Sequence, residues 1–161
     1  MSKAQSPEPK ATAYVDGLRM LGRRELSEAQ VRQRLARKGH QPDEIDAAVD
    51  RLRQERAIDD ARVAEAIAHT ETTVRRRGKL RVRRQIEQAG IAPATARHAI
   101  DEVFADIDGE ALLEEALRRR LRGRDRLDDE AEFRRLFRYL VGQGFEPDRV
   151  MSILRKYKPR G

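Results

Sequence analysis

The residues of this chain that could do chemistry are arginines and lysines gathered in short runs. Seven of the ten residues between positions 75 and 84 are basic and none is acidic. Guanidinium and ammonium groups bind phosphates and carboxylates, and self-repulsion within such a run favours an anionic partner. With two further runs, the predicted anion-binding residues are Arg75, Arg76, Arg77, Lys79, Arg81, Arg83, Arg84, Arg118, Arg119, Arg120, Arg122, Arg124, Arg155, Lys156 and Lys158.

Residues suited to catalysis or metal binding are scarce. The chain has no cysteine, and His40, His69 and His98 stand at unrelated positions, with no pair at ligand spacing. No zinc-protease, serine-hydrolase or phosphate-loop motif is present. We expect the histidines to be ordinary surface or turn residues and the acidic clusters at 59–60 and 128–130 to be helix caps. The sequence therefore predicts a protein that is not an enzyme and uses no cofactor or metal.

The composition is typical of a protein that meets a polyanion or an acidic surface. Among 161 residues, 35 are Lys or Arg and 28 are Asp or Glu, which gives a net charge of +7. No apolar run approaches the roughly 18 residues of a membrane-spanning helix. The polar start of the chain lacks the apolar stretch of a signal peptide. These features predict a cytoplasmic protein without a membrane partner.

The elements that must position the basic residues follow a repeat. One phrase, a glycine followed three residues later by a proline, occurs at Gly39, Gly90 and Gly144. An apolar pair precedes each glycine by eight and four residues, and further apolar residues follow each proline at helical spacing. The pairs are Val31 and Leu35, Val82 and Ile86, and Leu136 and Leu140. The pattern predicts the same helix-loop-helix corner three times.

Local signals give the expected helices. Ser27 and Gln30 form a capping box, each glycine suits a left-handed helix end, and each proline suits a first helical turn. The first helix should carry an apolar face of Tyr14, Leu18 and Leu21. The helix after Asp60 should carry Val63, Ile67 and Val74 and run to Arg76. The remaining expected helices cover 79–89, 93–105, 110–121, 129–141 and 147–157, and most aromatic residues of the last repeat should be core.

The predicted fold class is all-α: an elongated tandem array of three three-helix repeats that resemble helix-turn-helix domains. No segment alternates with a period of two, so we expect no sheet. The predicted organisation is a flexible leader at 1–10, repeats at 11–58, 59–108 and 109–158, and a tail at 159–161.

The chain resembles the RecX-type regulators of bacterial recombination from about Ala13 to Tyr157. The residues that carry the resemblance are Arg24-Glu25-Leu26-Ser27 followed by Val31, Leu35 and Lys38-Gly39; Asp59-Asp60-Ala61-Arg62-Val63-Ala64; Arg76-Arg77-Gly78 leading to Ile86 and Gly90-Ile91; and Arg138-Tyr139-Leu140 leading to Gly144-Phe145. Each phrase alone is weak, but their order and spacing are specific. The family's three tandem three-helix modules agree with the repeat, and the resemblance implies that the array is curved.

The resemblance implies a monomeric negative modulator that lodges in the groove of a RecA filament on single-stranded DNA. There it would inhibit ATP hydrolysis, strand exchange and co-protease activity. We expect the runs at 75–84 and 118–124 to face acidic groove surface or DNA, so replacing Arg77, Arg81 and Arg84 with glutamate should abolish inhibition and keep the helix content. Two alternatives stay open: a stand-alone, non-sequence-specific DNA-binding protein, and a helical scaffold for another partner.

Overall fold

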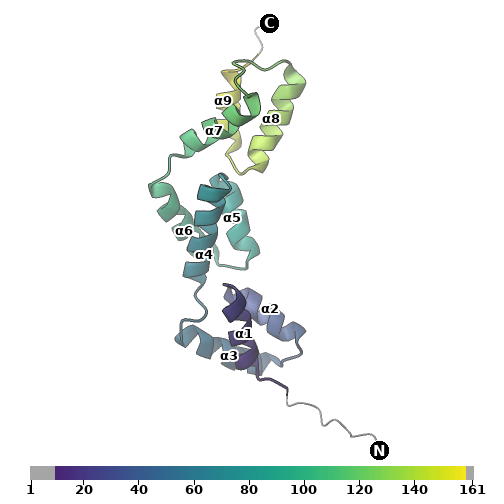
Figure 1. Cartoon of the computed structure of the whole chain (residues 1–161), viewed down its shortest axis with the longest axis vertical. Coiled ribbons are helices and arrows are strands. Elements are labelled where there is room, and N and C mark those ends of the chain that lie inside the picture. Colours follow the sequence, from purple (N-terminus) through teal and green to yellow (C-terminus); the bar gives the residue numbers. More distant parts are fainter. Residues whose placement is uncertain (1–9, 159–161) are drawn as a thin grey trace, which may run out of the picture. The chain divides into compact units, whose positions relative to one another are not determined.

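The structure of the chain, a computed structural model, describes residues 10–158 (Figure 1). The described residues form helices and connecting loops, without a strand, so the predicted all-α class is confirmed. The helices are α1 (Ala13–Arg23), α2 (Glu28–Arg37), α3 (Pro42–Gln54), α4 (Asp60–His69), the π-helical turn η1 (Thr70–Val74), α5 (Lys79–Gln88), α6 (Pro93–Ala105), α7 (Gly109–Leu121), α8 (Glu130–Gly142) and α9 (Pro147–Arg155). Residues 1–9 of the expected leader and the expected tail at 159–161 lie outside the described residues.

The chain divides into two compact units, residues 1–60 and residues 61–161. Helices α1 to α3 belong to the first unit, and helices α5 to α9 belong to the second, together with almost all of α4. Each unit has its own apolar core: one cluster in the first, and two clusters in the second that share contacts with Phe104.

The repeated apolar positions form these cores, as the spacing predicts. Both members of all three pairs that precede the glycines are buried. The first apolar positions after the prolines, Ile45, Ala96 and Val150, are buried too. Each repeat therefore packs its second helix against its third (Figure 1).

Helix α1 does not use the apolar face that its sequence suggests. Tyr14 and Leu21 pack against the edge of the first core, but Leu18 is 40% exposed. Small side chains face the core, because α3 passes close by: a Cβ on Gly17 would lie 2.7 Å from a methyl carbon of Leu52. Gly17 therefore occupies a core-facing position at which the apolar periodicity favours a leucine, because the helices pack closely there.

The capping box of α2 is confirmed. The Ser27 hydroxyl accepts a hydrogen bond from the Gln30 N–H at 3.2 Å, and the Gln30 side chain accepts from the Ser27 N–H at 3.0 Å. Asp129 caps α8 as expected, because its carboxylate accepts from the Glu132 N–H. Asp60 contacts a helix other than its own, which the sequence did not predict. Its carboxylate accepts a hydrogen bond from the Glu28 N–H at the start of α2, at 2.9 Å.

The first helix of the second repeat departs from expectation at its end. The α-helix ends at His69, and a π-helical turn follows. A π turn places more residues in each turn than an α-helix, so it rotates the following side chains. Glu71 and Thr72 are buried, whereas Val74 is 71% exposed. The prediction that Val74 belongs to the apolar face was therefore wrong.

Candidate anion-binding surface

A close backbone contact joins the second repeat to the third. Gly78, which precedes α5, donates its N–H to the Gln143 carbonyl at 3.0 Å, and the Leu80 N–H donates to the Gly144 carbonyl at 3.0 Å. The Arg81 guanidinium adds a hydrogen bond to the Gly142 carbonyl at 2.9 Å. The first turn of α5 thus satisfies the free carbonyls that end α8, and opposite ends of two helix dipoles meet.

This contact brings two of the predicted basic runs together. Arg75 and Arg76 precede α5, Arg119 and Arg120 end α7, and all four line one small cavity of about 80 Å³. Tyr139 of α8 forms another part of its wall. We call this depression the basic hollow. Residues more than 40 positions apart in the sequence therefore form one cationic surface within the second unit.

Glu115 is the single acidic residue that lines the basic hollow. It pairs with Arg76 and with Arg119, the latter at 2.7 Å. The hydrogen bond from Arg76 is the main reason that the pKa of Glu115 lies below its ordinary value. Arg120 stacks on Tyr139, with its guanidinium carbon 3.7 Å from the ring centre. One glutamate faces four arginines, so the hollow keeps an excess of positive charge.

Most of the run at 75–84 is held by contacts inside the chain. Glu71 is buried and pairs with Arg75 at 3.0 Å and with Arg77 at 2.8 Å. Lys79 lies over the ring of Phe104, 5.1 Å from its centre. The sequence suggested that no acid relieves the repulsion within this run, but Glu71 and Glu115 do so. Within residues 10–158, Arg83 and Arg84 have no acidic partner and are exposed.

Helix α5 also divides the run between two sides. Lys79 and Arg83 are four residues apart and share one side, whereas Arg81 and Arg84 are three apart and share another. Because the Arg81 side chain donates a hydrogen bond to the end of α8, the side of α5 that carries Arg81 faces the third repeat. The seven basic residues therefore do not form one continuous face.

These contacts change the expectation for the triple glutamate variant. Replacing Arg77 would weaken the pairing of the buried Glu71, and replacing Arg81 would remove a hydrogen bond of the α5 and α8 contact. Removing one partner of a buried ion pair is strongly destabilising. The variant is therefore expected to lose stability, so it cannot isolate a binding role.

The other predicted basic residues lie outside the basic hollow. Arg124 pairs with Glu132 and Asp128, and Lys158 lies 3.8 Å from Glu130. Lys156 lines a separate groove with α7 and α9. Arg118, Arg122 and Arg155 are exposed on the surface.

A cationic hollow in the first unit escaped the sequence interpretation. A cavity of about 500 Å³ is lined by basic residues from the C-terminal halves of α1 and α2 and from the loops after them. Asp16 is the acidic residue among its lining. The basic residues are scattered along the chain, so a count within ten-residue windows misses them, whereas a count by helix face would have found them. They are Arg19, Arg23, Arg24, Arg34, Arg37 and Lys38.

His40 stands in the turn between α2 and α3, as expected, but its side chain is buried and contacts Asp16 of this first-unit hollow. The His40 Nε2 is 2.7 Å from one carboxylate oxygen of Asp16. The other oxygen of Asp16 accepts a hydrogen bond from the Lys38 ammonium at 3.2 Å. The hydrogen bond with His40 is the main cause that lowers the pKa of Asp16. The corner at Gly39 thus rests on a buried polar pair that the repeat pattern does not reveal.

Metal-binding clusters and membrane-spanning helices are absent from the part of the chain that the structure describes. Residues 10–158 contain no group of three or more histidine, cysteine, aspartate or glutamate side chains placed to hold a metal ion. No helix in this range has the length and apolar character needed to cross a membrane.

Known proteins of similar sequence also contain three-helix domains. The model of the family described as RecX, first three-helix domain, matches residues 13–52. The regulatory protein RecX of Syntrophotalea carbinolica is 32% identical over 138 residues, which cover 85% of this chain and 90% of that protein. The chain belongs to the RecX family. The regulatory protein RecX of Chromohalobacter salexigens is also 32% identical, over 87% of this chain and 89% of the relative.

Solved structures of RecX proteins have the same fold as this family member. The crystal structure of RecX from Lactobacillus salivarius superposes with a TM-score of 0.70 at 18% identity, covering 90% of this chain and 94% of that one. A second structure, described as regulatory protein RecX, gives a TM-score of 0.72 at 19% identity. The helical fold is therefore shared by RecX proteins whose sequences have diverged widely.

Proposed function

We propose that this RecX-family protein is a negative modulator of a RecA-type recombinase. It acts as a monomer in the cytoplasm, binds in the groove of the recombinase filament on single-stranded DNA, and inhibits ATP hydrolysis, strand exchange and co-protease activity. It acts by binding and not by catalysis. Family membership supports the regulatory role, since relatives that align over most of the chain are regulatory proteins.

The observation that carries the proposal is the convergence of Arg75, Arg76, Arg119 and Arg120 on the basic hollow. Two repeats contribute to it, so the surface forms only when both repeats are packed together. Guanidinium groups held in this way suit carboxylates of a protein surface or phosphates of a nucleic acid. Because Arg120 already covers the Tyr139 ring, base stacking is disfavoured and contact with charged groups is favoured.

The first-unit hollow offers a second cationic surface on a separate compact unit. Two weak cationic contacts on one chain strengthen each other through effective concentration when a partner repeats its acidic groups along its length. A filament of identical subunits on DNA is such a partner. A single small globular protein is not.

The proposal is tested by ATP hydrolysis of the cognate recombinase on saturating single-stranded DNA, titrated with far fewer molecules of this protein than DNA sites. Inhibition at that ratio means action on the filament. The double variant Arg119→Glu with Arg120→Glu should raise the half-inhibitory concentration about tenfold or more, because it reverses the charge of the hollow at exposed positions.

A matched control carries the same change of charge elsewhere. Arg97 of α6 and Arg134 of α8 are exposed, and Arg134 is five residues from Tyr139, on another side of the helix. Arg97→Glu with Arg134→Glu should inhibit within about twofold of the unaltered protein. Inhibition that appears only when the DNA is covered, with a steep dependence on salt, would favour the stand-alone DNA-binding alternative.

A further inference from the structure

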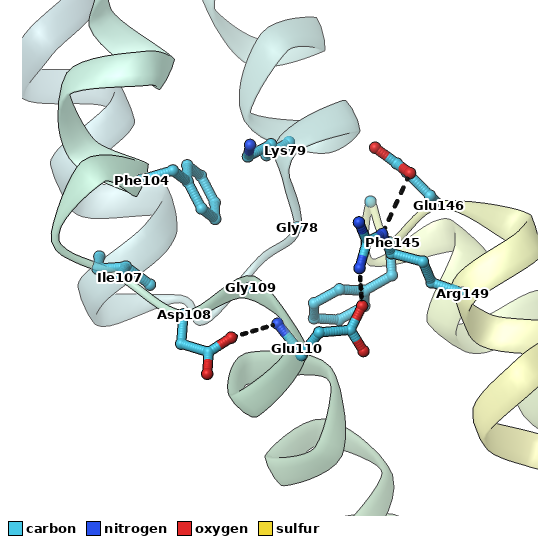
Figure 2. A pocket seen from close by; sticks show the side chains of 11 residues that line it. Gly78, Lys79, Phe104, Ile107, Asp108, Gly109, Glu110, Phe145, Glu146 and Arg149 are labelled. Carbon is cyan, nitrogen blue, oxygen red and sulfur yellow. Dashed lines mark hydrogen bonds and ion pairs between the residues drawn. The ribbon is translucent and has the colours of Figure 1, made fainter.

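A pocket of about 310 Å³ lies beside the α5 and α8 contact, with Gly78 and Gly144 in its wall. Polar and apolar residues line it, and its large apolar side chains are Phe104, Ile107 and Phe145. Figure 2 shows the two aromatic rings and the isoleucine side chain around this space. Phe145 is almost fully buried, while Phe104 and Ile107 are half-buried, and Lys79 lies over the Phe104 ring. A volume of this size is at the lower end of ligand pockets and fits one large side chain.

The pocket continues into a groove, and the net charge of the two together is opposite in sign to the net charge of the chain. The groove runs between α7 and α9 and shares Glu110, Glu146 and Arg149 with the pocket. Five acidic and three basic residues line the pocket and groove together, a local charge of −2 in a chain of net charge +7. We call the pocket and the groove together the acidic groove.

The charges on the rim are available to a partner. Arg149 pairs with Glu110 and lies 3.5 Å from Glu146, as Figure 2 shows, but each of these side chains is about half exposed. Ion pairs of this kind contribute little and exchange readily. Glu114 and Asp148 are exposed, and within residues 10–158 neither has a basic partner. A basic group of a partner could therefore bind these carboxylates without breaking a strong ion pair within the chain.

The acidic groove and the basic hollow use different sides of α7. Glu110 and Glu114 are four residues apart on one side, whereas Glu115 and Arg119 are four apart on another. A molecule could therefore occupy the groove while the basic hollow is engaged elsewhere. The acidic groove is therefore a second surface, separate from the basic hollow.

We propose that the acidic groove binds a basic segment of a protein partner. One bulky apolar side chain of the segment enters the pocket between Phe104, Ile107 and Phe145. Lysines or arginines beside it pair with the carboxylates of α7 and α9. A buried apolar anchor with charged neighbours is the usual arrangement of a short binding segment. The excess of carboxylates disfavours the phosphates of a nucleic acid at this surface.

The test uses a defined peptide and the full chain. The probe is an acetylated, amidated peptide with one leucine flanked on each side by two lysines, titrated to about 1 mM while the amide signals of the protein are followed by NMR. We expect shifts at Gly109, Glu110 and Phe145. A peptide with serine in place of the leucine, and one with glutamates in place of the lysines, should each bind about tenfold more weakly or not at all.

Charge reversal of the groove supplies the matching variant. Glu114→Lys with Asp148→Lys changes exposed side chains and breaks no ion pair of the described residues, and it should weaken binding of the leucine peptide about tenfold. The control, Glu65→Lys with Asp101→Lys, places the same charge change on α4 and α6 and should alter affinity less than about twofold.

Three results would overturn the proposal. The first is the absence of shifts at these amides at the highest peptide concentration. The second is equal binding of the serine peptide, which would mean that charge alone acts and that the pocket holds no anchor. The third is a single-stranded oligonucleotide that shifts the same amides, which would assign the surface to nucleic acid.

Discussion

The corners at Gly39 and Gly144 carry the same sequence phrase, but they differ in their surroundings. Both glycines follow the second helix of a repeat with positive φ, 88° and 100°. A Cβ at Gly39 would meet only the Lys10 ammonium, at 3.5 Å. A Cβ at Gly144 would lie 2.5 Å from the Arg81 nitrogen and 2.6 Å from the Gly78 carbonyl oxygen. A local signal for ending a helix has therefore gained a second role, docking one repeat on another.

The largest expected effect comes from filling the second of these corners. Gly144→Ala combines a side chain at positive φ with a clash against the backbone of the second repeat, and it should destabilise the second unit by about 3 to 5 kcal/mol. Gly39→Ala carries the conformational penalty alone, about 1 to 2 kcal/mol. Urea titrations read from amide signals of α8 and α2 would report each unit separately.

Gly142 supplies the control for this comparison. It lies in α8 beside Gly144, but no atom would come within 4 Å of an added Cβ. Gly142→Ala should therefore be neutral or stabilise by up to about 1 kcal/mol, because alanine favours the helix. Equal losses for Gly144→Ala and Gly39→Ala would refute the docking role.

A smaller effect concerns the polar pair beneath the corner at Gly39. Folding lowers the pKa of Asp16, chiefly through its hydrogen bond with His40, below the ordinary value of 3.8. A carboxylate with a lowered pKa stabilises the folded state above its unfolded pKa, and this contribution is lost as pH falls through the folded pKa. The first unit should therefore lose stability from about pH 4 downward.

Asp16→Asn should remove that contribution, at a loss of about 1 to 3 kcal/mol near pH 7. Its stability should then change less between about pH 4 and pH 2 than that of the unaltered chain. Lys38, Arg19 and Glu44 also face the pair, so the two proteins must be compared across the same pH series. Parallel pH curves would show that Asp16 does not contribute in this way.

The smallest effect separates two ways of starting a helix. Ser27 caps α2 with its own side chain, whereas α5 begins at Gly78 without a side-chain cap and donates to the carbonyls of α8. Ser27→Ala should destabilise the first unit by about 1 kcal/mol, and Ser27→Gly by only a few tenths. Thermal unfolding followed by amide signals of α2 would measure both. An unchanged midpoint for Ser27→Ala would mean that Asp60 alone sustains this end.

Most of the helix starts and core positions were predictable because their causes are local. The capping box at Ser27, the positive φ of the three corner glycines and the buried pairs before them all follow from spacing within one turn or one repeat. Leu18 and Val74 were assigned wrongly because packing overrode periodicity. Gly17 lies close against Leu52, and a π turn rotates Val74 outward.

The sequence by itself determined an all-helical chain of three repeated corners, because helical period, capping residues and glycine conformation act within a few residues. Only the tertiary structure decided which charges meet. Arg76 pairs with Glu115, which lies 39 positions later in the sequence. Arg81 donates a hydrogen bond to the Gly142 carbonyl at the end of α8, 61 positions later. No local signal specifies such pairs, because they depend on how two finished repeats pack. The same packing formed the basic hollow and the acidic groove from residues that are scattered in the sequence.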